Sequence, residues 1–169
     1  MNNAHLHLLV NHIPIIFPIV AIILLVAGIL TKSTFTRRNA YAIFILGAIA
    51  SAIAMATGEG AEEAVEHIAG ISENLIKTHE EAAVIFAGFS YFIAAVAAFA
   101  LYSEVKNLKF SKFLTPVVLL LSMGMMYFAQ EAGRTGGEIR HTEIRSNSTN
   151  QNVNQNSENG GDEGSDHDD

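Results

Sequence analysis

Three histidines, His5, His7 and His12, lie within eight residues near the start of the chain, directly before a long apolar run. Imidazole is a common ligand of haem iron, zinc, copper and non-haem iron. Ionisable residues at the edge of a membrane are costly and tend to mark function. The histidines of this chain are therefore candidate ligands of a redox cofactor or a metal ion.

Two histidines from distant parts of the chain are expected to lie at similar depth. His12 immediately precedes the first apolar run, and His79 lies just before the third. In an up-down bundle, spans one and three lie diagonally across the core, so their side chains can approach one central atom from opposite sides. We expect His12 and His79 to be the axial ligands of a haem b, with His7 and His141 as substitutes.

A haem in this position would have anionic propionates, which guanidinium groups match in geometry. Arg134, Arg140 and Arg145 follow the fourth apolar run and are the candidate partners. Two axial histidines leave no open position on the iron, so electron transfer would be the natural role. The chain has no cysteine, which excludes covalent haem attachment through Cys-x-x-Cys-His and thiolate metal sites.

A site of mixed histidines and carboxylates, for zinc or iron without a porphyrin, is the main alternative. Its candidate ligands are His12, His79, Glu80, Glu63 and His67. The di-iron pattern of helix bundles needs two Glu-x-x-His motifs, and the chain offers only Glu138 with His141. A third alternative is a structural membrane subunit with no cofactor. No nucleophile–base arrangement is present, and we do not expect an enzyme acting by itself.

The elements that would carry these residues are four apolar runs, each long enough to cross a bilayer as a helix. They predict an all-α, four-helix integral membrane bundle with spans at about 13–31, 40–57, 82–102 and 113–130. A stripe of glutamates after the second span predicts a short interfacial helix, followed by a new helix capped by Ser72. The pair Gly136-Gly137 predicts a tight turn after the fourth span.

The distribution of charge predicts the orientation in the membrane. Lysine and arginine are concentrated in the first and third loops, whereas the second loop holds one, Lys77. The positive-inside rule therefore puts both termini and every histidine on the periplasmic side of a bacterial inner membrane. The net charge of −7 argues against nucleic acid as a partner.

The chain divides into a transmembrane domain over residues 1–145 and a polar tail over residues 146–169. The tail has a single large apolar residue, Val153, and cannot bury enough surface to order itself, so we expect it to be disordered. The expected partners are the lipid bilayer, cytochrome c or another respiratory component, and in one alternative a second copy of the chain.

The N-terminal segment His7-Leu-Leu-Val-Asn-His12-Ile-Pro14 resembles the signature His-Pro-x-x-x-His-Phe-Pro-Ile of a family of small bacterial four-span membrane proteins of unknown function. The segment Gly136-Gly137-Glu-Ile is similar to that family's ending. Some members are joined to cytochrome c domains, so the resemblance implies a link to respiratory electron transfer. The chain departs from the signature at Leu8, where proline is usual, and has a longer acidic outer loop.

Overall fold

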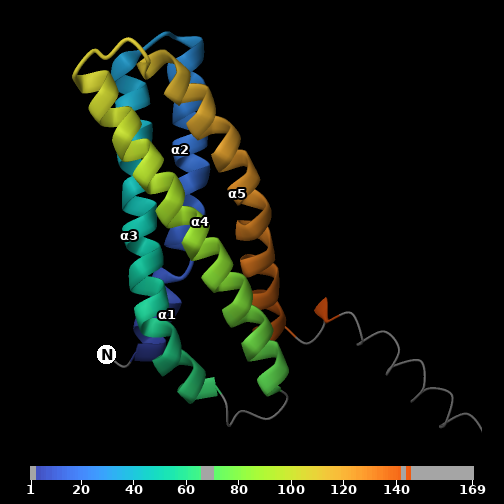
Figure 1. The fold of residues 1–169 in the computed structure, drawn as a ribbon. Coiled ribbons are helices and arrows are strands. Elements are labelled where there is room, and N and C mark those ends of the chain that lie inside the picture. Colours follow the sequence, from blue (N-terminus) through green and yellow to red (C-terminus); the bar gives the residue numbers. More distant parts are fainter. Residues whose placement is uncertain (1–2, 66–70, 142–143, 146–169) are drawn as a thin grey trace, which may run out of the picture.

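The computed structural model describes residues 3–65, 71–141 and 144–145, and no strand occurs among them. The helices are α1 (Asn3–Val10), α2 (Ile13–Leu30), α3 (Thr34–Val65), α4 (Glu73–Val105) and α5 (Ser111–Arg140). Figure 1 shows the four long helices side by side as an elongated bundle. The predicted all-α fold is confirmed.

Four helical stretches are long and apolar enough to cross a membrane. They are His5–Leu30, Thr34–Ala64, Glu73–Val105 and Ser111–Ile139. Each contains most or all of one predicted apolar run and extends beyond it at one end or both. Large apolar side chains are exposed along the outside of all four long helices, as expected where lipid rather than water is the surrounding medium.

The helices pack in a closed ring. α2 packs on α3 and α5, and α4 packs on α3 and α5, so α2 and α4 lie diagonally across the bundle. The short helix α1 packs on α3. Figure 1 shows α1, the end of α3, the start of α4 and the end of α5 at one end of the bundle, which we call the histidine end. The α2–α3 and α4–α5 loops lie at the other, the turn end.

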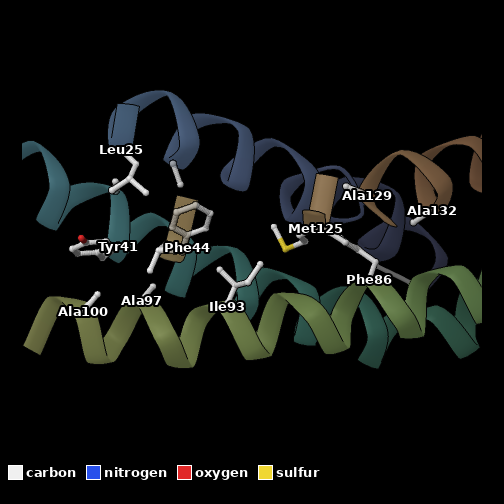
Figure 2. Close-up of a cluster of buried hydrophobic side chains, with 13 residues drawn as sticks. Leu25, Tyr41, Phe44, Phe86, Ile93, Ala97, Ala100, Met125, Ala129 and Ala132 are labelled. Carbon is white, nitrogen blue, oxygen red and sulfur yellow. The ribbon is translucent and has the colours of Figure 1, made fainter. Parts of the chain in front are cut away.

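The core contains few large side chains. Leu25, Phe44, Ile93 and Met125 are buried along the bundle, and Figure 2 shows them between the helices. Alanines fill much of the remaining core, including Ala97. Small residues let helix backbones approach closely, which favours helix association in lipid.

The break between α1 and α2 has a local cause in Pro14. Proline has no N–H to donate, and its ring clashes with the carbonyl four residues earlier. α1 accordingly ends at Val10, and α2 begins at Ile13. The carbonyl of His12 accepts hydrogen bonds from the N–H groups of Ile15 and Ile16 at 3.1 and 3.0 Å.

Two local expectations are wrong. The residues predicted to start a separate interfacial helix continue α3 without interruption through Val65, where α1 packs on α3. Tertiary packing therefore carries the helix past Gly58 and Gly60. Gly136 and Gly137 lie inside α5 rather than in a turn.

The predicted cap is confirmed, because Ser72 accepts a hydrogen bond from the Leu75 N–H at 3.4 Å. The predicted tail, residues 146–169, lies outside the described residues, as does the rest of the predicted interfacial segment, residues 66–70.

Candidate functional site

His7 is half-buried on α1 and points its Nδ1 atom at α3. Nδ1 lies 3.1 Å from the carbonyl oxygen of Ala54 and 3.2 Å from the Thr57 hydroxyl oxygen. A carbonyl oxygen can only accept, so Nδ1 carries the proton. The Thr57 hydroxyl donates to a carbonyl of its own helix, that of Ile53 or Ala54, at 3.0 Å. Its oxygen can therefore also accept from His7, and the Nε2 lone pair of the neutral ring remains available.

His79 is half-buried on α4 and makes the equivalent contact with α5. Its Nδ1 atom lies 3.1 Å from the Thr135 hydroxyl oxygen. Thr135 donates its hydroxyl hydrogen to the carbonyl of Glu131 at 2.9 Å or that of Ala132 at 3.2 Å. Because that hydrogen is already used, the oxygen accepts from His79, and Nδ1 is again the protonated nitrogen. The backbone of Ala132 also interacts with the His79 ring.

Both rings rest on the same five-residue sequence, Ala-x-x-Thr-Gly, which we call a cradle. Residues 54–58 of α3 form the His7 cradle, and residues 132–136 of α5 form the His79 cradle. The final glycine faces the imidazole in each. A Cβ atom at Gly136 would lie 3.0 Å from Cε1 of His79, and one at Gly58 would lie 3.9 Å from Cε1 of His7. The missing side chain therefore lets the His79 ring lie directly against α5.

The two cradled histidines share the histidine end of the bundle and are close enough to interact electrostatically. Each uses Nδ1 as a donor to its cradle and keeps Nε2 as a lone-pair donor. Metal-binding histidines in proteins usually have this arrangement, because a hydrogen bond from the second ring nitrogen sets the tautomer and the orientation of the ring. The pair can therefore supply two neutral nitrogen ligands.

His12 lies outside both cradles. It is exposed at the start of α2, and its side chain makes no capping hydrogen bond. His141 is exposed where α5 ends. The predicted ligand pair of His12 and His79 stays a prediction. His7, unlike His12, makes the same kind of contact with its cradle as His79 does, and both rings lie at the histidine end.

The predicted propionate partners are engaged along α5 where their side chains are described. Arg134 forms ion pairs with Glu131 and Glu138 of its own helix. The Arg145 guanidinium donates to the carbonyls of Glu138 and Ile139 at 2.8 and 3.2 Å, which satisfies carbonyls at the end of α5. The side chain of Arg140 lies outside the described part of the chain.

The acidic side chains of the alternative metal site do not gather into one group. Glu63 and Glu80 are both exposed. Within residues 3–65, 71–141 and 144–145, no three histidine, aspartate or glutamate side chains are arranged to hold a metal ion. His67 lies outside the described residues.

A second polar group lies at the turn end. Arg37 Nε and Nη2 lie 2.7 and 2.5 Å from Oε1 of Glu104, which is nearly fully buried. Arg38 donates to the Glu104 carbonyl at 2.9 Å. A charge buried in an apolar medium is costly unless it is paired with an opposite charge. Arg37 and Glu104 form such a pair, which joins α3 to α4.

The cradle threonines and glycines were not among the residues predicted to form the site. The pattern of titratable side chains pointed to histidines, arginines and glutamates, and an uncharged threonine is not part of that pattern. The signal that could have identified the threonines is the repetition of Ala-x-x-Thr-Gly at the end of the second predicted span and just after the fourth.

Comparison with known families finds one match over nearly the whole chain. The family described as "Predicted membrane protein (DUF2231)" matches residues 3–143. No curated protein and no solved structure matches the chain. The matched range contains both histidines and both cradles.

Proposed function

The chain belongs to the DUF2231 family of predicted membrane proteins. From the geometry of its two cradled histidines, we propose that it binds haem b near the periplasmic face and acts as an electron-transfer or redox-accessory protein. The axial ligands in this proposal are His7 and His79. The observation that carries it is the matching state of the two rings, each donating Nδ1–H to its own cradle.

The donor set fits haem iron. Neutral imidazole nitrogens are the usual axial ligands of b-type haem, and a pair of them leaves no coordination site for a substrate. When bound, haem b would supply one-electron chemistry. The residues of the chain would bind and orient it, with Thr57 and Thr135 holding the rings and preventing each Nε2 from carrying the proton.

The charge distribution supports the proposed orientation of the chain in the membrane. The loops at the turn end hold Lys32, Lys106 and Lys109, and the positive-inside rule assigns such loops to the cytoplasm. The histidine end would then face the periplasm of a bacterial inner membrane. Cytochrome c or another respiratory component would be the electron partner on that side, and the exposed apolar outer surface leaves room for a second copy of the chain.

The visible absorption spectrum of the full chain, purified in detergent from haem-replete cells, tests the proposal. We expect a Soret band and the sharp α-band of a reduced six-coordinate haem. His7→Ala and His79→Ala should each abolish or greatly weaken these bands, because each removes one axial nitrogen.

Two matched variants provide the controls. His5→Ala removes an exposed histidine from the same short helix as His7, and the spectrum should not change. His12→Ala distinguishes the two candidate pairs: an unchanged spectrum supports His7 with His79, and a lost band supports the predicted pair of His12 with His79. A colourless wild-type protein that does not bind added hemin would refute the haem proposal, and elemental analysis would then show whether zinc or iron is bound instead.

A further inference from the structure

We infer that the chain is two copies of one helical hairpin, and that the His7 and His79 cradles are equivalent halves of a single binding site. The first hairpin is α1–α3, and the second is α4–α5. The ligand class, a metal centre, rests on the proposed function, whereas the equivalence of the halves rests on the three structural correspondences that follow.

The first helix of each hairpin ends with the same three hydrogen bonds, although the loops that follow differ in length, residues 31–33 in the first hairpin and 106–110 in the second. In the first, Thr31 N–H donates to Ala27, Lys32 to Ile29 and Ser33 to Gly28, at 2.9, 3.2 and 3.0 Å. In the second, the donors are Lys106 to Tyr102, Asn107 to Glu104 and Leu108 to Ser103, at 2.9, 3.3 and 2.9 Å. The middle residue is left-handed in both, with φ of 55° at Lys32 and 53° at Asn107. Positive φ is uncommon outside glycine, so its recurrence at one position of two turns is informative.

Five buried positions in each pair of helices follow the same register in both hairpins, whereas some others are buried in one hairpin without a buried counterpart in the other: Tyr41, Ala48, Ala50, Ala87, Thr115 and Ala132. The first helices bury Pro14, Pro18, Ala21, Leu25 and Gly28 in one copy, and Phe86, Ser90, Ile93, Ala97 and Ala100 in the other. The second helices bury Ala40, Phe44, Gly47, Ser51 and Thr57 in one copy, and Val118, Ser122, Met125, Ala129 and Thr135 in the other. Within each pair of lists the spacing between successive members is identical.

The cradles are the third correspondence. In the first copy, His7 on the short helix α1 donates Nδ1–H to Thr57 of α3. In the second, His79 near the start of α4 donates Nδ1–H to Thr135 of α5. The following glycine faces the ring in each. The second hairpin is roughly one helical turn longer in both limbs, so histidine and threonine still meet at the same level.

This correspondence relates α2 to α4 and α3 to α5, which are the two diagonal pairs of the ring, as an approximate two-fold axis along the bundle would do. The two interfaces that such an axis would exchange are unequal, because α3 packs on α4 more extensively than α2 packs on α5. Parallel repeats related by an axis along the membrane normal are a known architecture of membrane proteins. The two histidines are exchanged by the same axis, so a ligand bound equally by both lies on it.

The chemistry of the paired nitrogens selects the ligand class. In the neutral Nδ1–H form, each Nε2 atom has a lone pair and no hydrogen, so it would attract an electron-pair acceptor and repel an anion. His7 and His79 would then hold a single metal centre through two equivalent nitrogens, as a haem iron would require. Thr57 and Thr135 are then positioning residues that contribute equally to ligand affinity, each through its own histidine.

Nitrogen NMR of histidine-labelled full chain in detergent tests the equivalence without any ligand. We expect both rings as Nδ1–H tautomers. Thr57→Val should change the signals of His7 and not those of His79, and Thr135→Val should do the reverse. Thr78→Val is the matched control, because Thr78 is exposed, adjoins His79 in sequence and donates its hydroxyl to the carbonyl of Asn74 of its own helix at 2.8 Å. It should move neither set of nitrogen signals appreciably.

Titration with hemin tests whether the two cradles contribute equally to hemin affinity. Each cradle variant should lower hemin affinity by about tenfold, the usual effect of removing a hydrogen-bond partner of a metal-binding histidine, and the two losses should agree within about threefold. Opposite tautomers of the two rings, or a loss in one variant with none in the other, would overturn the inference. If hemin does not bind but both rings are Nδ1–H and each responds to its own threonine, the haem proposal fails and the equivalence stands.

Discussion

The protonation of each cradled histidine follows from ordinary helix chemistry. Threonine in an apolar helix usually donates its hydroxyl to a carbonyl three or four residues earlier, because no water competes for it. Thr57 and Thr135 both do so. The hydroxyl oxygen is thereby left as an acceptor, and the ring nitrogen opposite it must bring the hydrogen. Two neutral residues thus set the tautomer of two titratable ones.

Gly136 lies closer to the His79 ring than Gly58 lies to the His7 ring, and this difference gives a prediction about single substitutions. Gly136→Ala should displace the His79 ring, because the new Cβ would lie 3.0 Å from Cε1 and 3.3 Å from Nδ1. We expect hemin affinity to fall by tenfold or more. Gly58→Ala is the matched control, since its Cβ would make only an ordinary contact with His7 at 3.9 Å. Equal hemin affinities for the two variants would show that the glycine contact does not position His79.

The helices themselves were largely predictable from sequence, and the site was predictable in part. Long uncharged runs predict spans because an unpaired charge in lipid is expensive. The choice between His7 and His12 could not be made from sequence, because Pro14 breaks the helix between them and turns their side chains to different surroundings. The prediction of His12 with His79 rested on their similar depth in the membrane, and depth alone does not say which way a side chain points.

The ends of the helices were less predictable than their centres. The stripe of glutamates predicted a separate interfacial helix after the second span, yet α3 continues through Val65 without interruption. Glu104 lay beyond the predicted third span, and its burial depends on Arg37 from another helix. Such pairing is a tertiary contact that a local pattern of residues does not reveal.

The close contact between α2 and α3 at the turn end gives a prediction about stability. A Cβ atom at Gly28 would lie 2.9 Å from the backbone nitrogen of Arg37, which cannot move without opening the turn. We expect Gly28→Ala to destabilise the protein by about 2 kcal/mol, as overpacking does, measured as a lower thermal midpoint in detergent.

Gly88→Ala is the matched control for that substitution. Gly88 is exposed on α4, and a Cβ atom there would meet nothing within 4 Å. Alanine is the better helix former, so the thermal midpoint should stay unchanged or rise. Similar losses in the two variants would mean that the α2–α3 contact has no special role.

Across the whole molecule, the two hairpins are joined at several depths. The Arg37–Glu104 pair links α3 to α4 at the turn end, and the Ser51 hydroxyl donates to the Ser90 hydroxyl at 3.3 Å farther along the same two helices. Buried side chains of α4 that Figure 2 labels, such as Ile93 and Ala97, lie between these two levels of the helix. The contact between the copies is therefore polar as well as apolar.

The orientation of the molecule can be tested directly, because the chain has no cysteine. Asn74 is exposed at the histidine end, and Lys109 is exposed at the turn end. In spheroplasts, a membrane-impermeant maleimide should label Asn74→Cys at once and Lys109→Cys only after lysis, since the positive-inside rule puts the turn end in the cytoplasm. The reverse pattern would place the histidine site on the cytoplasmic side.

Joining two hairpins in one chain makes assembly of the site independent of the concentration of the protein. If the halves were separate polypeptides, each binding event would require two of them to meet in the membrane, and occupancy would fall steeply with expression level. A covalent link replaces that encounter by an intramolecular one with an effective concentration in the millimolar range. The two half-sites therefore remain matched one to one at any abundance of the protein. Each half is also free to diverge from the other, and the longer second hairpin and the proline break in the first are two such differences.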